Sequence, residues 1–408
     1  IPGWKRGPAQ LRVTGPIKKR FEVISLPHSL GGEIEGKLVY LGDGAIADYE
    51  SRKDEIDGNI VLVTSRNPMG IQRFLHRSEK YMRSVLAGAK GWIFMNHYQA
   101  YGPPTGGVSP VIPAVGISYE DGSYLVRLTE RSDEVIVKLR TTDTNYDVDT
   151  FNVICDVEPK DPVDDEYVVV GSHYDGHDIS QGAMDPASGT VTVMEIARVL
   201  NKVKKNLNRR VRCICFGAEE IGLYGSYNYV ARHRNEMDKA RFMLNLDSGG
   251  SPGKKGVIFH NFPELETLLR QWAAEMNVEM PTDQKISPYS DHWPFFLSSV
   301  PCGSGGDPEA RRTRTGRGYG HTKYDTVDKV DQQFLRLAAA NYSRFVFRIA
   351  NVQEWPARRK NPEEIQEFIK KQGFDKTVTL AEKTKKYIKT WKEILPETQA
   401  WLNRKSDW

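Results

Sequence analysis

Hydrophobic runs and polar breaks divide the chain into parts with different patterns. Between residues 37 and 140, short runs rich in Val, Ile and Leu are bounded by Gly, Asp and Pro, as in KLVYLGDG and DGNIVLVTS. These runs predict β-strands, and KYMRSVLAGAKG predicts a helix that stops before the strand WIFMN. We therefore expect a β-rich unit over 37–140, inserted into a larger domain formed by 1–36 and 141–351.

From about residue 150, predicted strands and helices alternate. The apolar strand EYVVVGSH (166–173) precedes a helix over 188–203, and RRVRCICFG (209–217) and RFMLNLDSGG (241–250) predict further strands. This alternation predicts an α/β fold with a mixed, mainly parallel central sheet and helices on both faces. Ligands of such sheets collect at the carboxyl ends of the strands. The charged segment 352–408 predicts a C-terminal helical extension.

Composition narrows the class of protein. With 408 residues, 39% hydrophobic and 27% charged, the chain resembles a soluble globular protein, and its net charge of +4 is too small to imply a nucleic-acid partner. No run of about 18 apolar residues exists, so no membrane span is expected. Residues 1–30 contain no apolar signal core, so we expect no targeting peptide within them. The cysteines form no CxxC pair and are expected to be buried thiols rather than zinc ligands: Cys155, Cys213, Cys215 and Cys302.

Acidic and imidazole side chains follow successive predicted strands. They are His173 and Asp175 in HYD, Asp185 in GAMDPASG, Glu219 and Glu220 in GAEEIG, Asp247 in NLDSGG and His321 in GYGHTKYDT. Singly, each has an ordinary explanation; Asp185, for example, could cap a helix. Together at one sheet edge, the carboxylates would repel one another and be costly to desolvate, which a cation would relieve. Mixed imidazole and carboxylate ligands suit zinc, with cobalt or manganese possible, and two metals about 3.5–4 Å apart could share one carboxylate.

The order HxD, GAxDxASG, EE, NLD and HTxxDT resembles the di-zinc exopeptidase family, which contains secreted bacterial leucyl aminopeptidases, glutamate carboxypeptidases and glutaminyl cyclases. The resemblance covers residues 150–350, and IPAVGIS followed by an acidic turn and a helix resembles a protease-associated (PA) domain at 37–140. It implies a peptide substrate, two zinc ions and a secreted or cell-envelope location. The implied roles are as follows: His173 and Asp247 hold one zinc, Glu220 and His321 hold the other, Asp185 bridges them, Glu219 is the general base, and Asp175 orients His173.

Two features depart from the family pattern. Pro186 stands where the family has Asn after the bridging aspartate, and since the family's peptide bond there is cis, we predict a cis Asp185–Pro186 bond. The helices that usually precede the PA insertion are missing from the sequence, so either the chain is truncated or its lineage has lost them.

A further stretch, PYSDHWPFF, resembles the SDHxxF segment that borders the family's substrate pocket. Tyr289, Asp291 and His292 either line that pocket or support the ligands, although an ordinary helix start explains the stretch equally well. His177 and Asp178 are assigned to a loop, because the family pattern does not use them.

The resemblance favours an aminopeptidase; the alternatives are a carboxypeptidase or dipeptidase of the same family, a glutaminyl cyclase and a non-catalytic receptor-like protein. A carboxypeptidase needs a cation for the substrate's terminal carboxylate, which a loop before His321 could supply from Arg311, Arg312, Arg314 or Arg317. A glutaminyl cyclase would use one zinc, and the PA insertion argues mildly against it. A non-catalytic receptor is least expected, because every predicted ligand position is filled. The sequence leaves side-chain preference, oligomeric state and the role of the PA unit open.

Overall fold

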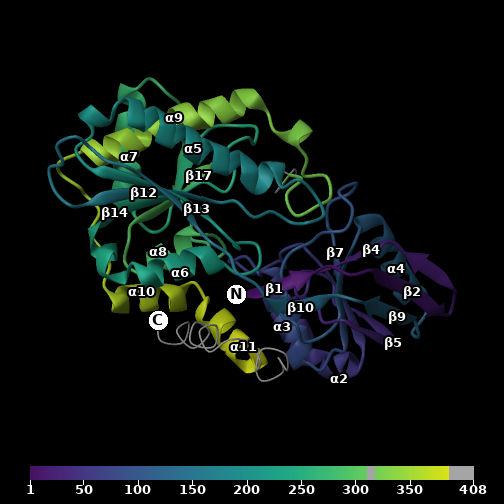
Figure 1. The fold of residues 1–408 in the computed structure, drawn as a ribbon. Coiled ribbons are helices and arrows are strands. Elements are labelled where there is room, and N and C mark those ends of the chain that lie inside the picture. Colours follow the sequence, from purple (N-terminus) through teal and green to yellow (C-terminus); the bar gives the residue numbers. More distant parts are fainter. Residues whose placement is uncertain (310–317, 386–408) are drawn as a thin grey trace. The chain divides into compact units, whose positions relative to one another are not determined.

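The computed structural model describes residues 1–309 and 318–385, which divide into two compact units (Figure 1). The first unit contains Ile1–Asp149, His321–Lys323 and the described part of the C-terminal segment from Phe368. The second contains Thr150–Gly320 and Tyr324–Glu367. None of the helices within the described residues is long and apolar enough to cross a membrane.

The second unit is built on a seven-stranded mixed sheet with the order β11-β13-β12-β14-β17-β15-β16. Its strands are β11 (Val153–Val157), β12 (Tyr167–His173), β13 (Arg210–Phe216), β14 (Ala240–Asn245), β15 (Gly256–Phe259), β16 (Thr282–Gln284) and β17 (Cys302–Gly306). The four strands from β13 to β17 in this order pair in parallel, whereas β11 and β15 run antiparallel to β13 and β17. Every residue of β12 is buried, as expected for a central strand covered on both faces. The predicted fold class is confirmed.

Helices cover both faces of this sheet, with α5, α7 and α9 on one face and α6 and α8 on the other (Figure 1). They are α5 (Ser188–Lys202), α6 (Tyr224–Arg232), α7 (Pro263–Glu275), α8 (His292–Leu297), α9 (Gln332–Asn351) and α10 (Pro362–Lys371), with the short turns η1 (Ala183–Ala187), η2 (Lys204–Asn206), η3 (Arg234–Lys239) and η5 (Val327–Lys329). In α9, the buried residues Ala338, Tyr342, Phe345 and Ile349 recur every three or four positions. This spacing forms the apolar stripe that packs the helix on the core.

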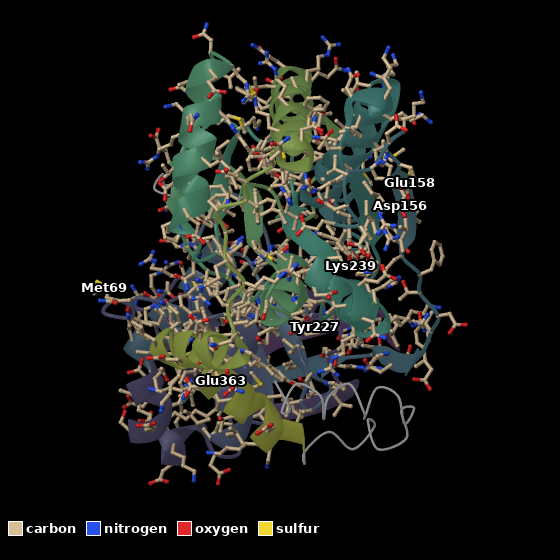
Figure 2. All side chains as sticks on the ribbon, turned by 90° about the vertical axis from the view of Figure 1, so that its left-hand side faces the viewer. Met69, Asp156, Glu158, Tyr227, Lys239 and Glu363 are labelled. Atoms are coloured by element: carbon tan, nitrogen blue, oxygen red, sulfur yellow. The ribbon has the colours of Figure 1, made fainter. Side chains whose placement is uncertain are left out.

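Polar side chains connect the edge strand β11 to its neighbour β13. Asp156, labelled in Figure 2, accepts two hydrogen bonds from the Arg212 guanidinium of the neighbouring strand at 2.7 and 2.8 Å. Cys155 precedes it and is exposed, so the expectation of a buried thiol is wrong there, because an edge strand has a partner on one side only. Cys213 and Cys302 are buried, as expected.

The first unit contains an eight-stranded mixed sheet with the order β3-β2-β9-β5-β6-β7-β8-β4. Its strands are β2 (Ala9–Gly15), β3 (Lys19–Phe21), β4 (Val23–Ser25), β5 (Gly32–Tyr40), β6 (Ile60–Thr64), β7 (Gly91–Met95), β8 (Ala114–Ile117) and β9 (Ile136–Thr141), while β1 (Pro2–Lys5) pairs with β10 (Thr144–Asp147). Strands β2, β3 and β4 therefore pair within this unit, although the sequence placed 1–36 with the larger domain. Leu11 and Val13 lie opposite Leu139 and Val137 of β9, and all four are buried.

The helices of the first unit include a buried cluster of charges. They are α1 (Ile46–Ser51), α2 (Lys53–Ile56), α3 (Arg77–Leu86), α4 (Tyr119–Arg131) and α11 (Asp375–Lys385). The fully buried Glu79 of α3 pairs with Arg73 and Arg83 at 2.7 Å each, and its Oε2 accepts the hydroxyl of Thr377 from α11 at 3.0 Å. Burial acts to raise the pKa of Glu79, but the two guanidinium groups outweigh it and hold that pKa below its ordinary value. The C-terminal segment thus completes a polar cluster of the first unit.

Candidate metal centre

Three parallel neighbours, β13, β12 and β14, end at one level of the sheet in the second unit. His173 pairs in register with Phe216, and Gly171 with Asn245. His173 is the last residue of β12, while Glu219 and Asp247 follow the ends of β13 and β14 within three residues. Because these strands are parallel, the side chains that follow them gather at one edge.

Carboxylates from two other segments approach the His173 imidazole at this edge. His173 Nε2 lies 3.2 Å from Asp185 Oδ1 and 3.9 Å from Asp247 Oδ1. A tetrahedral zinc with bonds of about 2.0–2.1 Å holds its ligand atoms about 3.3 Å apart. The distance from His173 Nε2 to Asp185 Oδ1 is close to this value, and imidazole and carboxylate are groups that zinc prefers.

The imidazole of His173 is oriented by its other nitrogen. His173 Nδ1 lies 2.9 Å from the backbone carbonyl oxygen of Asp175, which can only accept a hydrogen bond. Nδ1 therefore carries a proton, which leaves Nε2 as the ring atom that could bind a metal beside Asp185 and Asp247. Asp175 orients His173 through its backbone, since the carboxylate Oδ1 lies farther from Nδ1, at 3.7 Å.

The Asp175 carboxylate instead holds the turn that carries the paired glutamates. Its two oxygens accept the backbone N–H groups of Glu219 at 3.0 Å and Glu220 at 3.2 Å. Ala218 and Leu223, at the two ends of this turn, adopt left-handed backbone conformations with φ of 58° and 59°. Such conformations cost non-glycine residues roughly 1–2 kcal/mol and occur where a fixed geometry is needed.

The segment that carries Asp185 packs closely on the end of β14. The Asp185–Pro186 bond is cis, so the prediction for this bond is confirmed. Four residues beyond Asp185, a Cβ atom on Gly189 would lie 1.9 Å from the backbone oxygen of Leu246, which explains why the GAMDPASG motif ends in glycine. The Ser188 hydroxyl also accepts the backbone N–H of Gly249 at 2.9 Å. These contacts fix the Asp185 segment against the loop of Asp247.

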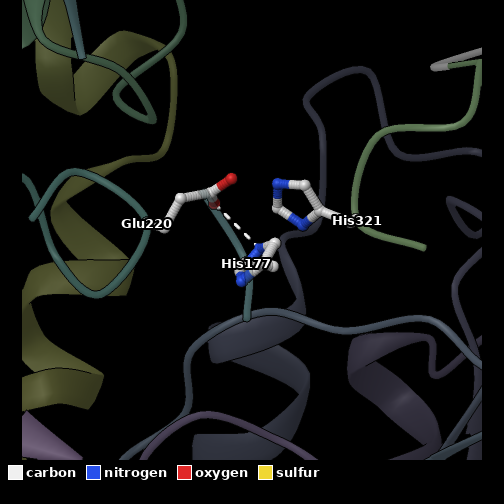
Figure 3. A group of neighbouring side chains, drawn as sticks. All are labelled: His177, Glu220 and His321. Atoms are coloured by element: carbon white, nitrogen blue, oxygen red, sulfur yellow. Dashed lines mark ion pairs between the residues drawn. The ribbon is translucent and has the colours of Figure 1, made fainter. Parts of the chain in front are cut away.

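Glu220 is buried and pairs with His177, a loop residue to which the family pattern assigns no role. His177 Nε2 lies 3.0 Å from Glu220 Oε2, and Figure 3 shows the two side chains facing each other. His177 follows the HxD motif by only two residues, and no further signal in the sequence marks it. His321 belongs to the segment His321–Lys323, which groups with the first unit, and its role as a ligand stays a prediction.

The electrostatics of the cluster favour a cation. Burial lowers the pKa of His173, but the carboxylates of Glu219, Asp175 and Asp185 outweigh it and hold that pKa well above its ordinary value. Burial raises the pKa of Glu219 well above its ordinary value, and Glu220 raises it further while His173 opposes. Closely spaced carboxylates that resist ionisation mark a place where a bound cation would be stabilised.

The PYSDHWPFF stretch lies behind this edge. Ser290 Oγ donates a hydrogen bond to Asp247 Oδ1 at 2.7 Å and accepts one from Asn245 Nδ2 at 2.7 Å. Asp291 is fully buried, and burial raises its pKa to about 7. The buried His292 stacks on His260 with ring centroids 3.8 Å apart. Of this stretch, Ser290 is the residue whose side chain contacts a predicted ligand, and the roles of Asp291 and His292 stay predictions.

The remaining predicted residues are less defined. Tyr289, next to Ser290, is half-buried. The arginines suggested for a carboxylate grip, Arg311, Arg312, Arg314 and Arg317, lie outside the described residues.

Comparisons with known proteins identify two matching regions of the chain. Residues 152–346 match the model of peptidase family M28, and residues 34–125 match the PA domain. The chain is 30% identical over 312 residues to aminopeptidase YwaD of Bacillus subtilis (strain 168), covering 73% of this chain and 64% of YwaD. It is 23% identical to carboxypeptidase Q of Xenopus laevis, covering 87% of this chain and 76% of that protein.

A solved structure gives a similar picture. That of a zinc aminopeptidase from Bacillus subtilis aligns with a TM-score of 0.60 at 25% identity, covering 88% of this chain and 86% of the other. The chain thus spans most of this structure, but less than two thirds of the length of YwaD.

Proposed function

We propose that the chain is a zinc-dependent aminopeptidase that releases N-terminal residues from peptides, because residues 152–346 match the model of peptidase family M28 and residues 34–125 match the PA domain. The observation that carries the proposal is the proximity of His173 Nε2 to the carboxylates of Asp185 and Asp247 at the edge of the sheet. The similarity to an aminopeptidase and to a zinc aminopeptidase supports this choice.

The family resemblance implies two zinc ions, with cobalt or manganese as possible substitutes. His173 and Asp247 would hold one ion, Glu220 and His321 the other, and Asp185 would bridge them. When bound, such ions lower the pKa of a water molecule and polarise the carbonyl group of the substrate.

The protein's own residues supply proton transfer and positioning. Glu219 takes a proton from the attacking water and delivers it to the leaving amine. The carboxylate of Asp175 fixes the turn of Glu219, so that the general base and the ligand Glu220 diverge from one short segment. Ser290 and Asn245 hold the carboxylate of Asp247.

Carboxypeptidase activity is the second candidate, because the chain aligns with carboxypeptidase Q over 87% of its length. An N-blocked dipeptide has no free amine, so its hydrolysis in preference to an aminoacyl anilide would favour this candidate. A metal content near one per chain with cyclisation of N-terminal Gln would favour a glutaminyl cyclase. A fully metallated protein without peptide hydrolysis would indicate a receptor-like protein.

The proposal is tested with a panel of aminoacyl-p-nitroanilides and N-blocked dipeptides. We expect hydrolysis of the anilides, its loss after chelation, and its recovery on addition of zinc, since the metals and Glu219 act together. Metal analysis of the active protein should give two zinc ions per chain. Anilide hydrolysis that survives complete removal of metal would contradict the proposal.

A further inference from the structure

Asp325 is a buried carboxylate in the second unit that has no part in the proton transfer described above. Its residue is only 1% exposed. Oδ1 accepts the backbone N–H of Met184 at 2.7 Å, and Oδ2 accepts that of Asp185 at 3.1 Å. The backbone carbonyl of Asp325 also accepts the N–H of Gln181 at 3.2 Å. The N–H of Ala183 approaches the same carbonyl at 3.5 Å, so one residue holds four positions of the loop that carries the predicted bridging ligand.

This loop needs acceptors from outside itself. Gly182 is left-handed with φ of 56°, and Asp185 is extended with φ of −124° and ψ of 99°, although its neighbours are helical. Met184 and Asp185 precede α5, and backbone N–H groups at the start of a helix have no acceptor within the helix. A carboxylate is the strongest available acceptor, and Asp325 binds two successive N–H groups.

A second contact joins the same two segments. Gln181 Oε1 accepts the backbone N–H of Val327 at 2.7 Å, so the loop before α5 and the segment after Tyr324 hold each other from both sides. Asp325 also follows His321 by four residues in the chain. One short stretch of sequence therefore carries one predicted ligand and the group that holds the backbone of another.

We propose that Asp325 is a positioning residue of the metal centre, which fixes the backbone of Met184 and Asp185 so that the Asp185 carboxylate faces His173. The inference rests on the proposed function, since it takes Asp185 as a metal ligand. The hydrogen bonds of Asp325 reach the backbone of Asp185 and leave its carboxylate at 3.2 Å from His173 Nε2. Without Asp325, the Asp185 carboxylate would sample several positions, and an ion would have to order the loop on binding.

The test compares zinc affinity and kinetics of Asp325→Asn with those of the unmodified protein. Asparagine keeps the shape, but its NH2 group faces one of the two backbone N–H donors. We expect zinc affinity, measured by competition with a chromogenic chelator, to fall by about 10–100-fold for at least one ion. At saturating zinc, kcat for an aminoacyl-p-nitroanilide should fall while KM changes by less than about threefold.

Three further variants make the result specific. Asp328→Asn removes an exposed carboxylate three residues away and should leave zinc affinity unchanged. Asp164, which precedes β12, pairs with the buried Arg209. Asp164→Asn breaks this ion pair and should destabilise the fold without changing the metal centre. Asp325→Glu keeps the charge in place if Asp325→Asn fails to fold, and its added methylene should displace the loop and weaken zinc binding.

The outcomes separate this inference from the proposed function. Unchanged zinc affinity in the folded Asp325 variants, or an equal loss in Asp164→Asn, would overturn the positioning role while leaving an active zinc enzyme. If the unmodified protein binds no zinc and hydrolyses no peptide, the proposed function is wrong, and the positioning role that rests on it is wrong as well.

Discussion

In two places of the second unit, an aspartate carboxylate accepts hydrogen bonds from two successive backbone N–H groups; we call each such carboxylate a clamp. Asp175 binds the backbone N–H groups of Glu219 and Glu220, and Asp325 binds those of Met184 and Asp185. Asp175 reaches a turn 44 residues away and its side chain is 25% exposed, whereas Asp325 reaches 140 residues and is 1% exposed. A partly exposed clamp can exchange its partner for water, but a buried one cannot. Two carboxylates with the same number of hydrogen bonds can therefore differ in how much stability is lost when they are removed, because water can replace only the exposed one.

The turn held by Asp175 provides the largest expected effect. Glu219→Gln should lower kcat by about 10²–10⁴-fold and retain both zinc ions, because the general base is lost but no ligand is. Glu220→Gln should lose zinc affinity as well as activity. Metal analysis and anilide kinetics on the two variants check the expectation, and identical metal loss in both would remove the distinction between the neighbouring glutamates.

The two clamps themselves give a smaller, graded effect on folding. Asp325→Asn should lower the free energy of unfolding of the metal-free protein by about 2 kcal/mol, and Asp175→Asn by about 1 kcal/mol, because water can reach only the Asp175 site. Urea unfolding monitored by circular dichroism measures both values. If Asp175→Asn proves the more costly, exposure does not decide the strength of the clamps.

The same contrast explains what the sequence could predict. Asp175 lies two residues beyond β12, and the parallel register of β12 with β13 places it beside the turn after Phe216. The spacing of strand and motif was therefore enough to gather His173, Glu219 and Asp247 at one edge. No strand pairing fixes the loop of Asp325, so its partners could not be read from the chain. The sequence also does not predict the pairing of β2 with β9, because the two strands lie some 130 residues apart in the chain.

The smallest expected effect concerns the support of Asp247. Ser290→Ala removes the hydroxyl that donates to Asp247 Oδ1, but Asn245 Nδ2 donates to the same oxygen at 3.0 Å and remains. Zinc affinity should therefore fall by less than about tenfold, at the lower limit for residues that support ligands. Chelator competition on Ser290→Ala measures it. If zinc affinity falls as much as in Asp325→Asn, the hydrogen bond from Asn245 does not compensate for the lost hydroxyl of Ser290.

The contact between Glu79 and Thr377 in the first unit has a consequence for biosynthesis. The two residues are 298 positions apart, and the whole stretch Thr150–Gly320 of the second unit is translated between them. At about 5–20 residues per second, a ribosome needs about 15 to 60 s to proceed from Glu79 to Thr377. During this time Arg73 and Arg83 can already neutralise Glu79, but the hydroxyl of Thr377 does not yet exist. The unit whose translation begins first is therefore the one completed last.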